Sequence, residues 1–366
     1  MQRQSAFWLR ILTLLYLGAC TLANRDACAQ QADVPAATKA GPHIAVLLPL
    51  KSTAVGRQAD AVRLGVLEAA KVHRGTTLPL VVYATSDESF DVVEAYENAV
   101  RSGAQFVIGP LTRSAVTSLA ATQLVNVPTL ALSAPDADAV LPQNLFVFGL
   151  QVENEAKQIA QLAREKGRRA LIIAADTALS RRLAQAFADE FARRGGTVVD
   201  QAQYTSDAPA LTKLRDSIAA GVSDVIFLAL DAQRARAIRS YLGGTQAIFA
   251  TSLVYVSADP LANHELNGVY FVDMPWLLSP DHPAVLAYAR QTQNSLEFQR
   301  FYALGIDAYR IAQDLLKATA GRAPLDGVTG TIPPARDHRF VRESTPAQFN
   351  QGETRTLSDT LGRPNG

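Results

Sequence analysis

The stretch "HIAVLLPL" at residues 43–50 is a short apolar run that lacks the polar alternation of a half-exposed strand. Such runs are typical of strands buried on both faces of a parallel sheet. In the next segment, small and apolar residues recur at spacings of three and four: Ala59, Val62, Val66 and Ala69. This spacing predicts a helix with one apolar face. A buried strand followed by an amphipathic helix is the repeating unit of α/β folds.

The alternation of strand and helix continues along the chain. Further strands are predicted for "LPLVVYAT", "QFVIGP" and "PTLALSAP", with helices over "SFDVVEAYENAVRSG" and "TRSAVTSLAATQL" between them. A second set begins near Leu145, with helices at 152–166 and 180–194 and strands at "RALIIAA", "SDVIFLAL", "QAIFATS" and "GVYFVD". Two similar sets predict two doubly wound, Rossmann-like α/β lobes with right-handed crossovers.

The chain continues beyond the second set. Helical patterns at 283–294 and 301–318 precede a β-like segment that contains "GVTGTI". The simplest topology returns the chain to the first lobe near 273–280 and crosses again near 330. Several crossovers between two lobes make a hinged cleft, with the ligand-binding ends of the strands facing it. This is the plan of type I periplasmic binding proteins.

These patterns predict the following boundaries. Residues 43–350 form the folded unit, with a first lobe of about 43–148 plus 275–330 and a second of about 149–274 plus 331–350. Residues 1–19 are expected to be a lipoprotein signal peptide. Residues 20–42 are expected to be a flexible tether because 30–42 are small and polar, and 351–366 a disordered tail because the end of the chain lacks apolar periodicity.

The amino-terminal segment is typical of an exported protein. Arg3 and Arg10 precede an apolar run, and small residues follow it. Leu17-Gly18-Ala19-Cys20 fits a lipobox, which would make Cys20 a lipid anchor and leave Cys28 incidental. Ala27-Cys28-Ala29 fits ordinary cleavage after Ala29, which would release a soluble periplasmic protein. An uncleaved membrane helix is disfavoured, since a span needs about 20 apolar residues and the run from Ala6 to Ala23 has 18 with Arg10 inside it.

Composition excludes several classes of protein. The 366 residues carry a net charge of +1, which gives no field to attract nucleic acid. No phosphate loop, G-x-S-x-G elbow or H-E-x-x-H helix occurs in the sequence, and its five histidines follow no metal spacing. We therefore expect no catalytic residues, no metal and no cofactor.

Polar residues that follow strand ends are candidates for a ligand site in the cleft. They are Ser52, Thr53, Ser133, Thr251, Ser252 and Asp273. The alternative is that they cap helices or end strands. Asp273 with Ser133 would suit an α-amino acid, the carboxylate holding the ammonium group. Trp276, in a predicted crossover, is either a partner's anchor or packed against the hinge.

Several motifs occur in order across residues 44–332: "IAVLLPLKSTAVGRQADAVRLGVLEAA", "FVIGPLTRSAVTSLA", "PTLALSAP", "FVFGLQVENEAKQIAQLA", "VYFVDMPWLL", "RFYALGIDAYRIAQ" and "GVTGTI". Together they resemble the C-terminal domain of the LppC/LpoA family of outer-membrane lipoproteins, which activate penicillin-binding proteins. The better-known members carry a helical-repeat domain before this one. Here about twenty residues separate Cys20 from the first predicted strand.

The resemblance implies a non-enzymatic lipoprotein with a type I periplasmic-binding-protein fold. It implies an anchor at Cys20, in the periplasmic face of the outer membrane, and a class A penicillin-binding protein as partner, so that the protein regulates peptidoglycan synthesis. The alternative is a periplasmic solute-binding protein that delivers an amino acid or related small molecule to a transporter, because the fold alone does not choose between them.

Overall fold

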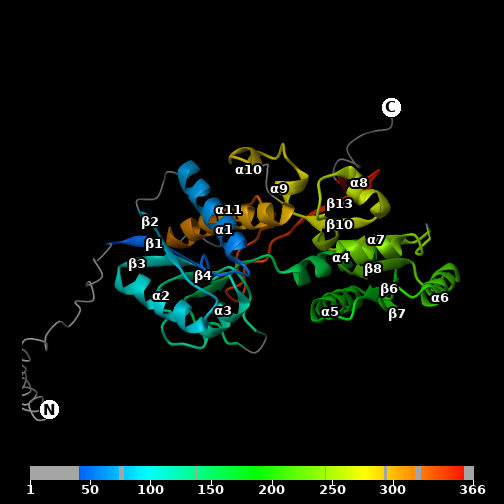
Figure 1. Ribbon diagram of the computed structural model, residues 1–366, viewed down its shortest axis with the longest axis horizontal. Coiled ribbons are helices and arrows are strands. Elements are labelled where there is room, and N and C mark those ends of the chain that lie inside the picture. Colours follow the sequence, from blue (N-terminus) through cyan, green and yellow to red (C-terminus); the bar gives the residue numbers. More distant parts are fainter. Residues whose placement is uncertain are drawn as a thin grey trace, which may run out of the picture. The chain divides into compact units, whose positions relative to one another are not determined.

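The structure is a computed structural model that describes residues 41–73, 78–136, 139–243, 245–291, 295–317 and 323–357. The predicted signal peptide and nearly all of the predicted tether, with Cys20 and Cys28, lie outside the described residues. Two large sheets, each covered by helices, organise the described part of the chain (Figure 1).

The first sheet is parallel, with the strand order β2-β1-β3-β4-β5. Its strands are β1 (His43–Leu48), β2 (Leu80–Ala84), β3 (Ala104–Ile108), β4 (Thr129–Ala131) and β5 (Leu145–Val147). Its helices are α1 (Gly56–Val72), α2 (Ser89–Arg101), α3 (Arg113–Ala120) and α11 (Leu296–Leu316). Figure 1 shows α1 and α11 on one face and α2 and α3 on the other.

Strand β1 explains why its sequence is a continuous apolar run. Ile44, Val46 and Leu48 pack in the core with α1 and α11, whereas Ala45 and Leu47 pack in the core with α2 and α3. Every residue of the strand is buried. Because successive side chains point to opposite faces, a sheet covered on both sides needs apolar residues at every position.

The second sheet has the strand order β14-β13-β10-β9-β8-β6-β7. Its strands are β6 (Arg169–Ala174), β7 (Thr197–Gln203), β8 (Val225–Ala229), β9 (Ala247–Ala250), β10 (Tyr270–Asp273), β13 (Thr345–Asn350) and β14 (Glu353–Thr356). Strands β6 to β10 are parallel, and β13 and β14 are antiparallel additions at one edge. Helices α4 (Val152–Lys166) and α5 (Ala178–Arg193) share one core with the sheet, and α6 (Ala208–Ala219) and α7 (Ala232–Arg239) contribute to the other.

The chain passes between the two sheets three times. It leaves the first sheet after β5 and enters α4, it returns after β10, and it passes again at 341–344 before β13. Short elements surround these connections: α8 (Pro260–Asn263), α9 (Pro275–Leu278), α10 (Pro283–Leu286), β11 (Leu325–Asp326), β12 (Thr331–Ile332) and the 3-10 helices η1 (Ser252–Val254) and η2 (His264–Leu266). The predicted fold class, two doubly wound lobes joined by crossovers, is confirmed.

Some elements differ from those predicted. The disordered tail was expected from residue 351, but 353–356 form β14, which pairs with β13. Gln351 and Gly352 both have positive φ angles, 53° and 80°, which is the backbone of a tight two-residue hairpin turn. Within the predicted helix 283–294, the structure describes a helix only over Pro283–Leu286.

Helices α1 and α11 approach each other through two glycines. A Cβ atom on Gly65 would lie 2.0 Å from the carbonyl oxygen of Tyr302, and one on Gly305 would lie 2.1 Å from that of Val62. Both obstacles are backbone atoms, which cannot move aside without separating the helices. The two helices therefore form one closely packed layer over the first sheet.

We predict that Gly65→Ala lowers the free energy of unfolding by about 3 kcal/mol, the upper end of the usual cost of over-packing. Gly56→Ala, at the start of the same helix, is the control, because its Cβ would meet backbone only at 3.4 Å. Denaturant unfolding of both variants measures the difference. Equal stability of the two variants would show that α1 and α11 are not held at this distance.

Candidate functional site

Four charged side chains lie where the chain passes between the sheets: Asp273, Glu155 and Arg342 are buried, and Arg300 is partly buried. Asp273 and Glu155 are 0% and 3% exposed, and their arginine partners are 15% and 5% exposed. Charges at such depth are costly unless they are paired and hydrogen-bonded. We call this group, together with Ser252, the hinge network.

The first pair joins strand β10 to helix α11. Nη2 of Arg300 lies 2.5 Å from Oδ2 of Asp273 and also donates to the carbonyl oxygen of Tyr255 at 2.7 Å. The backbone N–H of Met274 donates to Oδ1 of Asp273 at 2.8 Å. Burial disfavours the charged form of Arg300, but Asp273 outweighs this effect and raises the pKa of Arg300 above its usual range. The second sheet is thereby tied to a helix of the first.

The second pair joins helix α4 to the third connection. Nη2 of Arg342 lies 2.5 Å from Oε1 of Glu155, and its Nη1 donates to Oγ of Ser344 at 2.5 Å. Burial raises the pKa of Glu155, and Arg342 acts in the opposite direction. Gln158 exchanges two hydrogen bonds with the backbone of Ser344, at 2.6 and 2.9 Å. This connection is therefore held against α4 by both charge and hydrogen bonds.

Ser252 links the two ion pairs. Its backbone N–H donates to Oε2 of Glu155 at 3.0 Å, and its carbonyl oxygen accepts from Nη2 of Arg300 at 3.3 Å. One residue at the end of β9 thus contacts both an α4 carboxylate and an α11 guanidinium. The network spans all three connections because Asp273, Glu155 and Arg342 each lie at or beside a different one.

The structure brings three of the predicted candidates together and separates the others. Ser252 and Asp273 belong to the hinge network, and neighbouring Thr251 is fully buried, its Oγ1 without a hydrogen-bond partner among the described residues. Ser52 accepts hydrogen bonds from the backbone of Ala54 and Val55, before α1. Thr53 is exposed, and Ser133 lies beyond β4 in the first sheet. A ligand-binding role for any of the six remains a prediction.

Trp276 is fully buried beside the second connection. Its indole Nε1 donates to Oε1 of Gln299 at 2.8 Å, and its ring lies 5.6 Å from that of Tyr302. The guanidinium of Arg290 lies 4.8 Å from the indole centroid. These contacts match the alternative in which Trp276 packs against the hinge. A partner protein could not contact the side chain, because it has no exposed surface.

A cavity of about 360 Å³ adjoins the hinge network. Its charged lining consists of Arg113, Lys157, Arg339 and Glu153, and Glu153 is bound by Arg182 at 2.8 Å. Neither Asp273 nor Ser133 lines it. An amino acid's ammonium group needs a carboxylate, and here the lining is mainly cationic. This hinge cavity consequently favours anions over α-amino acids.

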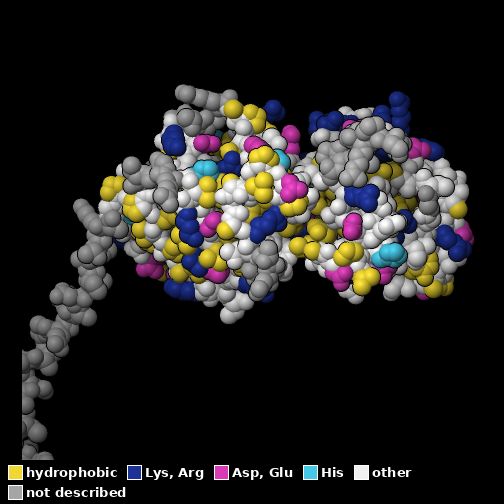
Figure 2. Space-filling view, turned by 90° about the horizontal axis from the view of Figure 1, so that it is seen from above, with side chains coloured by type: hydrophobic (Ala, Val, Ile, Leu, Met, Phe, Trp, Pro, Cys, Tyr) yellow, Lys and Arg dark blue, Asp and Glu magenta, His cyan; other side chains and the backbone are white. Residues whose placement is uncertain are grey.

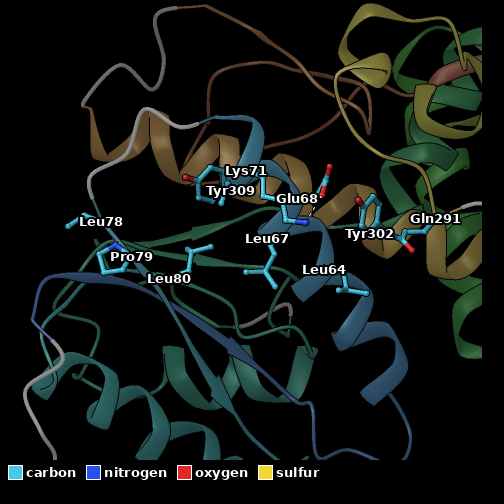
Figure 3. Close-up of a pocket in the computed structure, with 11 residues that line it drawn as sticks. Leu64, Leu67, Glu68, Lys71, Leu78, Pro79, Leu80, Gln291, Tyr302 and Tyr309 are labelled. Carbon is cyan, nitrogen blue, oxygen red and sulfur yellow. Dashed lines mark hydrogen bonds and ion pairs between the residues drawn. The ribbon is translucent and has the colours of Figure 1, made fainter.

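A second cavity, of about 460 Å³, lies on the outer side of the first sheet (Figure 3). Leu64 and Leu67 of α1 face Leu80 of β2 across it, so its walls are mostly apolar. At its rim, Glu68 accepts from Lys71 at 3.1 Å and from the backbone of Ala289 at 3.2 Å. Its polar rim is thus already hydrogen-bonded.

Sequence reasoning missed the cations of the hinge network. Glu155 does leave a signal, because it lies on the same face of its helix as Ala156, Ile159 and Ala163, where a carboxylate is unexpected. Arg300 and Arg342 leave no comparable signal. Within the described ranges, no cluster of three or more His, Cys, Asp or Glu residues could hold a metal ion, and no helix there is long and apolar enough to span a membrane.

The two sheets, their three connections and the hinge between them define a type I periplasmic-binding-protein-like protein. The C-domain of LpoA from Haemophilus influenzae, described as "a regulator of PBP1A", has the same fold, with a TM-score of 0.73 over 86% of this chain and 99% of that one, at 23% identity. A structure from Chromobacterium violaceum, described as "a putative branched-chain amino acid ABC transporter", is 39% identical, with a TM-score of 0.72 over 84% of this chain and 99% of that one.

Residues 39–352 match the family described as "LppC putative lipoprotein", and the chain belongs to this family. Among curated relatives, the penicillin-binding protein activator LpoA of Yersinia pseudotuberculosis is 27% identical over 334 residues, covering 76% of this chain and 49% of that protein. The chain spans about half the length of the curated relatives it matches. The resemblance predicted from the sequence motifs is confirmed.

We predict that Arg342→Met lowers the free energy of unfolding by about 3–5 kcal/mol, because it leaves a carboxylate buried without its cation. Arg182→Met is the control, since its partner Glu153 lies in the same turn of α4 but Arg182 is half exposed, and the expected loss is below about 1 kcal/mol. Denaturant unfolding at neutral pH measures both losses.

The loss in Arg342→Met should also depend on pH. Removing Arg342 raises the pKa of Glu155 further, so the folded state favours the protonated carboxyl more strongly than the unfolded state does. The deficit relative to wild type should therefore be largest near neutrality and shrink as pH falls toward the usual pKa of glutamate, because below the raised pKa of Glu155 the carboxyl is protonated in both proteins. A deficit independent of pH would contradict a charged Glu155–Arg342 pair.

Proposed function

We propose that this protein is a non-enzymatic envelope lipoprotein that binds and stimulates a class A penicillin-binding protein and so regulates peptidoglycan synthesis. The observation that carries this proposal is the charge pattern at the hinge. Asp273, Glu155 and Glu153 are all bound by arginines, so none of these three carboxylates is free for the ammonium group of a transported amino acid. Membership of the LppC family, with relatives named as activators, supports the same conclusion.

A binding protein stimulates an enzyme by shifting the equilibrium between the enzyme's inactive and active states toward the active state. The bound protein favours the active state only if it binds that state more tightly than the inactive one. A rigid docking surface serves this purpose better than a mobile one, because less conformational freedom is lost on binding. The hinge network supplies rigidity by holding the two lobes through paired charges.

The face of the protein in Figure 2 has no concentration of charge of one sign. Figure 2 shows basic and acidic side chains interspersed over the face in view, without a large field of one sign. With a net charge of +1, long-range attraction to a partner is weak. Binding to the synthase should therefore depend only modestly on salt concentration.

We predict that the full-length protein binds a class A penicillin-binding protein from the same cell saturably and raises its transpeptidase rate. The measurement is binding titration with the rate followed in parallel. Bovine serum albumin at the same concentration controls for crowding. No binding and no stimulation would contradict the proposal.

The competing function is delivery of a solute to a transporter, which the 39% identical Chromobacterium structure favours by its description. The same preparation separates the two functions. An increase in melting temperature on addition of leucine, valine or glutamate would support the solute-binding alternative, because a ligand that binds only the folded state stabilises it. Indifference to all three amino acids is expected.

The proposed anchor is Cys20, in the periplasmic face of the outer membrane. We predict that Cys20→Ala abolishes membrane association, because a protein without acyl chains loses the hydrophobic contribution of lipid to membrane binding. Cys28→Ala is the matched control and should fractionate like the wild type. If Cys20→Ala is instead processed and distributed as the wild type, cleavage after Ala29 is the correct alternative.

A further inference from the structure

A small cavity of about 260 Å³ lies at the carboxyl end of α11, away from the hinge. Its lining residues are His73, Arg310, Gln313, Asp314, Lys317 and Leu325. It shares no lining residue with the hinge cavity or with the apolar cavity of Figure 3. We call it the α11-end cavity.

Gln313 is the unusual member of this lining. It is only 6% exposed, yet neither its Nε2 nor its Oε1 has a hydrogen-bond partner among the described residues. A buried amide without partners is destabilising, and most buried polar groups in proteins avoid this state. An apolar side chain of similar length would fill the position at lower cost.

Gln299, on the same helix, is a buried glutamine with a structural role and serves as a comparison. It is equally buried, at 6% exposure. Its Oε1 accepts from the indole of Trp276 at 2.8 Å, and its Nε2 donates to the carbonyl oxygen of Gln291. The contrast indicates that Gln313, which lines the cavity with an unpartnered amide, has a role other than packing.

The charged side chains that line the same cavity are Arg310, Lys317 and Asp314. Nη1 of Arg310 lies 3.2 Å from Oδ1 of Asp307, and Lys317 ends the helix as an exposed residue. The ring Nε2 of His73 lies 2.6 Å from the hydroxyl of Tyr288. Burial lowers the pKa of His73, Arg310 and Lys317 lower it further, and Asp314 opposes them. Two cations, Arg310 and Lys317, and one carboxylate, Asp314, line the cavity, and this excess of positive charge favours an anion.

We propose that the α11-end cavity binds a small oxyanion that carries a neighbouring N–H or O–H group. The oxyanion is held by Arg310, Lys317 and Nε2 of Gln313, and the neighbouring donor is held by Oε1 of Gln313. This chemistry fits the carboxyl end of a peptide, with its last amide N–H, and also fits protonated inorganic phosphate. The site is independent of the proposed synthase activation.

The test is an NMR titration of the full-length protein with N-acetylglycine and, separately, with inorganic phosphate. The side-chain amide of Gln313 and the ring of His73 are the reporters. We expect saturable shifts of both and a higher His73 pKa in the bound state, because an anion favours the imidazolium form. Saturation by N-acetylglycine alone assigns a peptide terminus, and equal saturation by both assigns a general oxyanion site.

Variants distinguish the site from surface binding. Gln313→Leu should weaken binding about tenfold or more, equivalent to at least one good hydrogen bond, without lowering the melting temperature. Lys317→Met should weaken it as well, and Gln185→Leu, on exposed α5, should bind as the wild type. Absence of shifts with both probes, or wild-type affinity in Gln313→Leu, would overturn the proposal.

Discussion

The backbone of Ser252 connects two buried ion pairs, and the relation between the two sheets depends on this connection. Asp273–Arg300 and Glu155–Arg342 are out of water, so neither pair can separate without leaving a charge in an apolar environment. Replacing a buried pair by apolar residues is often neutral or stabilising, so stability alone does not explain it. The network does fix the orientation of the connections between the sheets, because hydrogen bonds are directional and apolar contacts are not.

That orientation limits what the cleft can do. An amino acid binds through a carboxylate that pairs with its ammonium group. At this hinge the carboxylates of Asp273 and Glu155 are already paired with arginines, so the hinge is poorly suited to binding an amino acid. Three carboxylates at the hinge, Asp273, Glu155 and Glu153, are bound by arginines, and the cations that line the hinge cavity attract anions. The same paired charges give a rigid surface, which is an advantage for a protein that acts by binding another protein. Fold and function therefore separate here: the fold permits solute binding, and the site chemistry argues against it.

Sequence patterns predicted the buried central strands and also the edge strand β2, but they missed β5, β7, β13 and β14. Strand β1 is an unbroken apolar run because two helical layers cover it, whereas β7, "TVVDQAQ", is a partly exposed edge strand whose polar residues conceal it. Ser252 and Asp273 could be nominated because strand ends are visible in sequence. Their partners could not, since Arg300 lies 27 residues from Asp273 and Arg342 lies 187 residues from Glu155. Only the tertiary structure brings such residues together.

Helix α11 joins the hinge to the α11-end cavity within one rigid element. Arg300 lies near its start, Gln313 near its end, and Gly305 between them lies against α1 with no room for a Cβ atom. Contact between backbones at this distance prevents α11 from sliding along α1, so the two helices must move together. A ligand at Gln313 could therefore affect Arg300 only by moving the whole α1–α11 layer over the first sheet. Coupling of that kind requires two distinct positions of the layer, each favoured by one ligand state. The close glycine contacts therefore exclude a movement of α11 that leaves α1 in place.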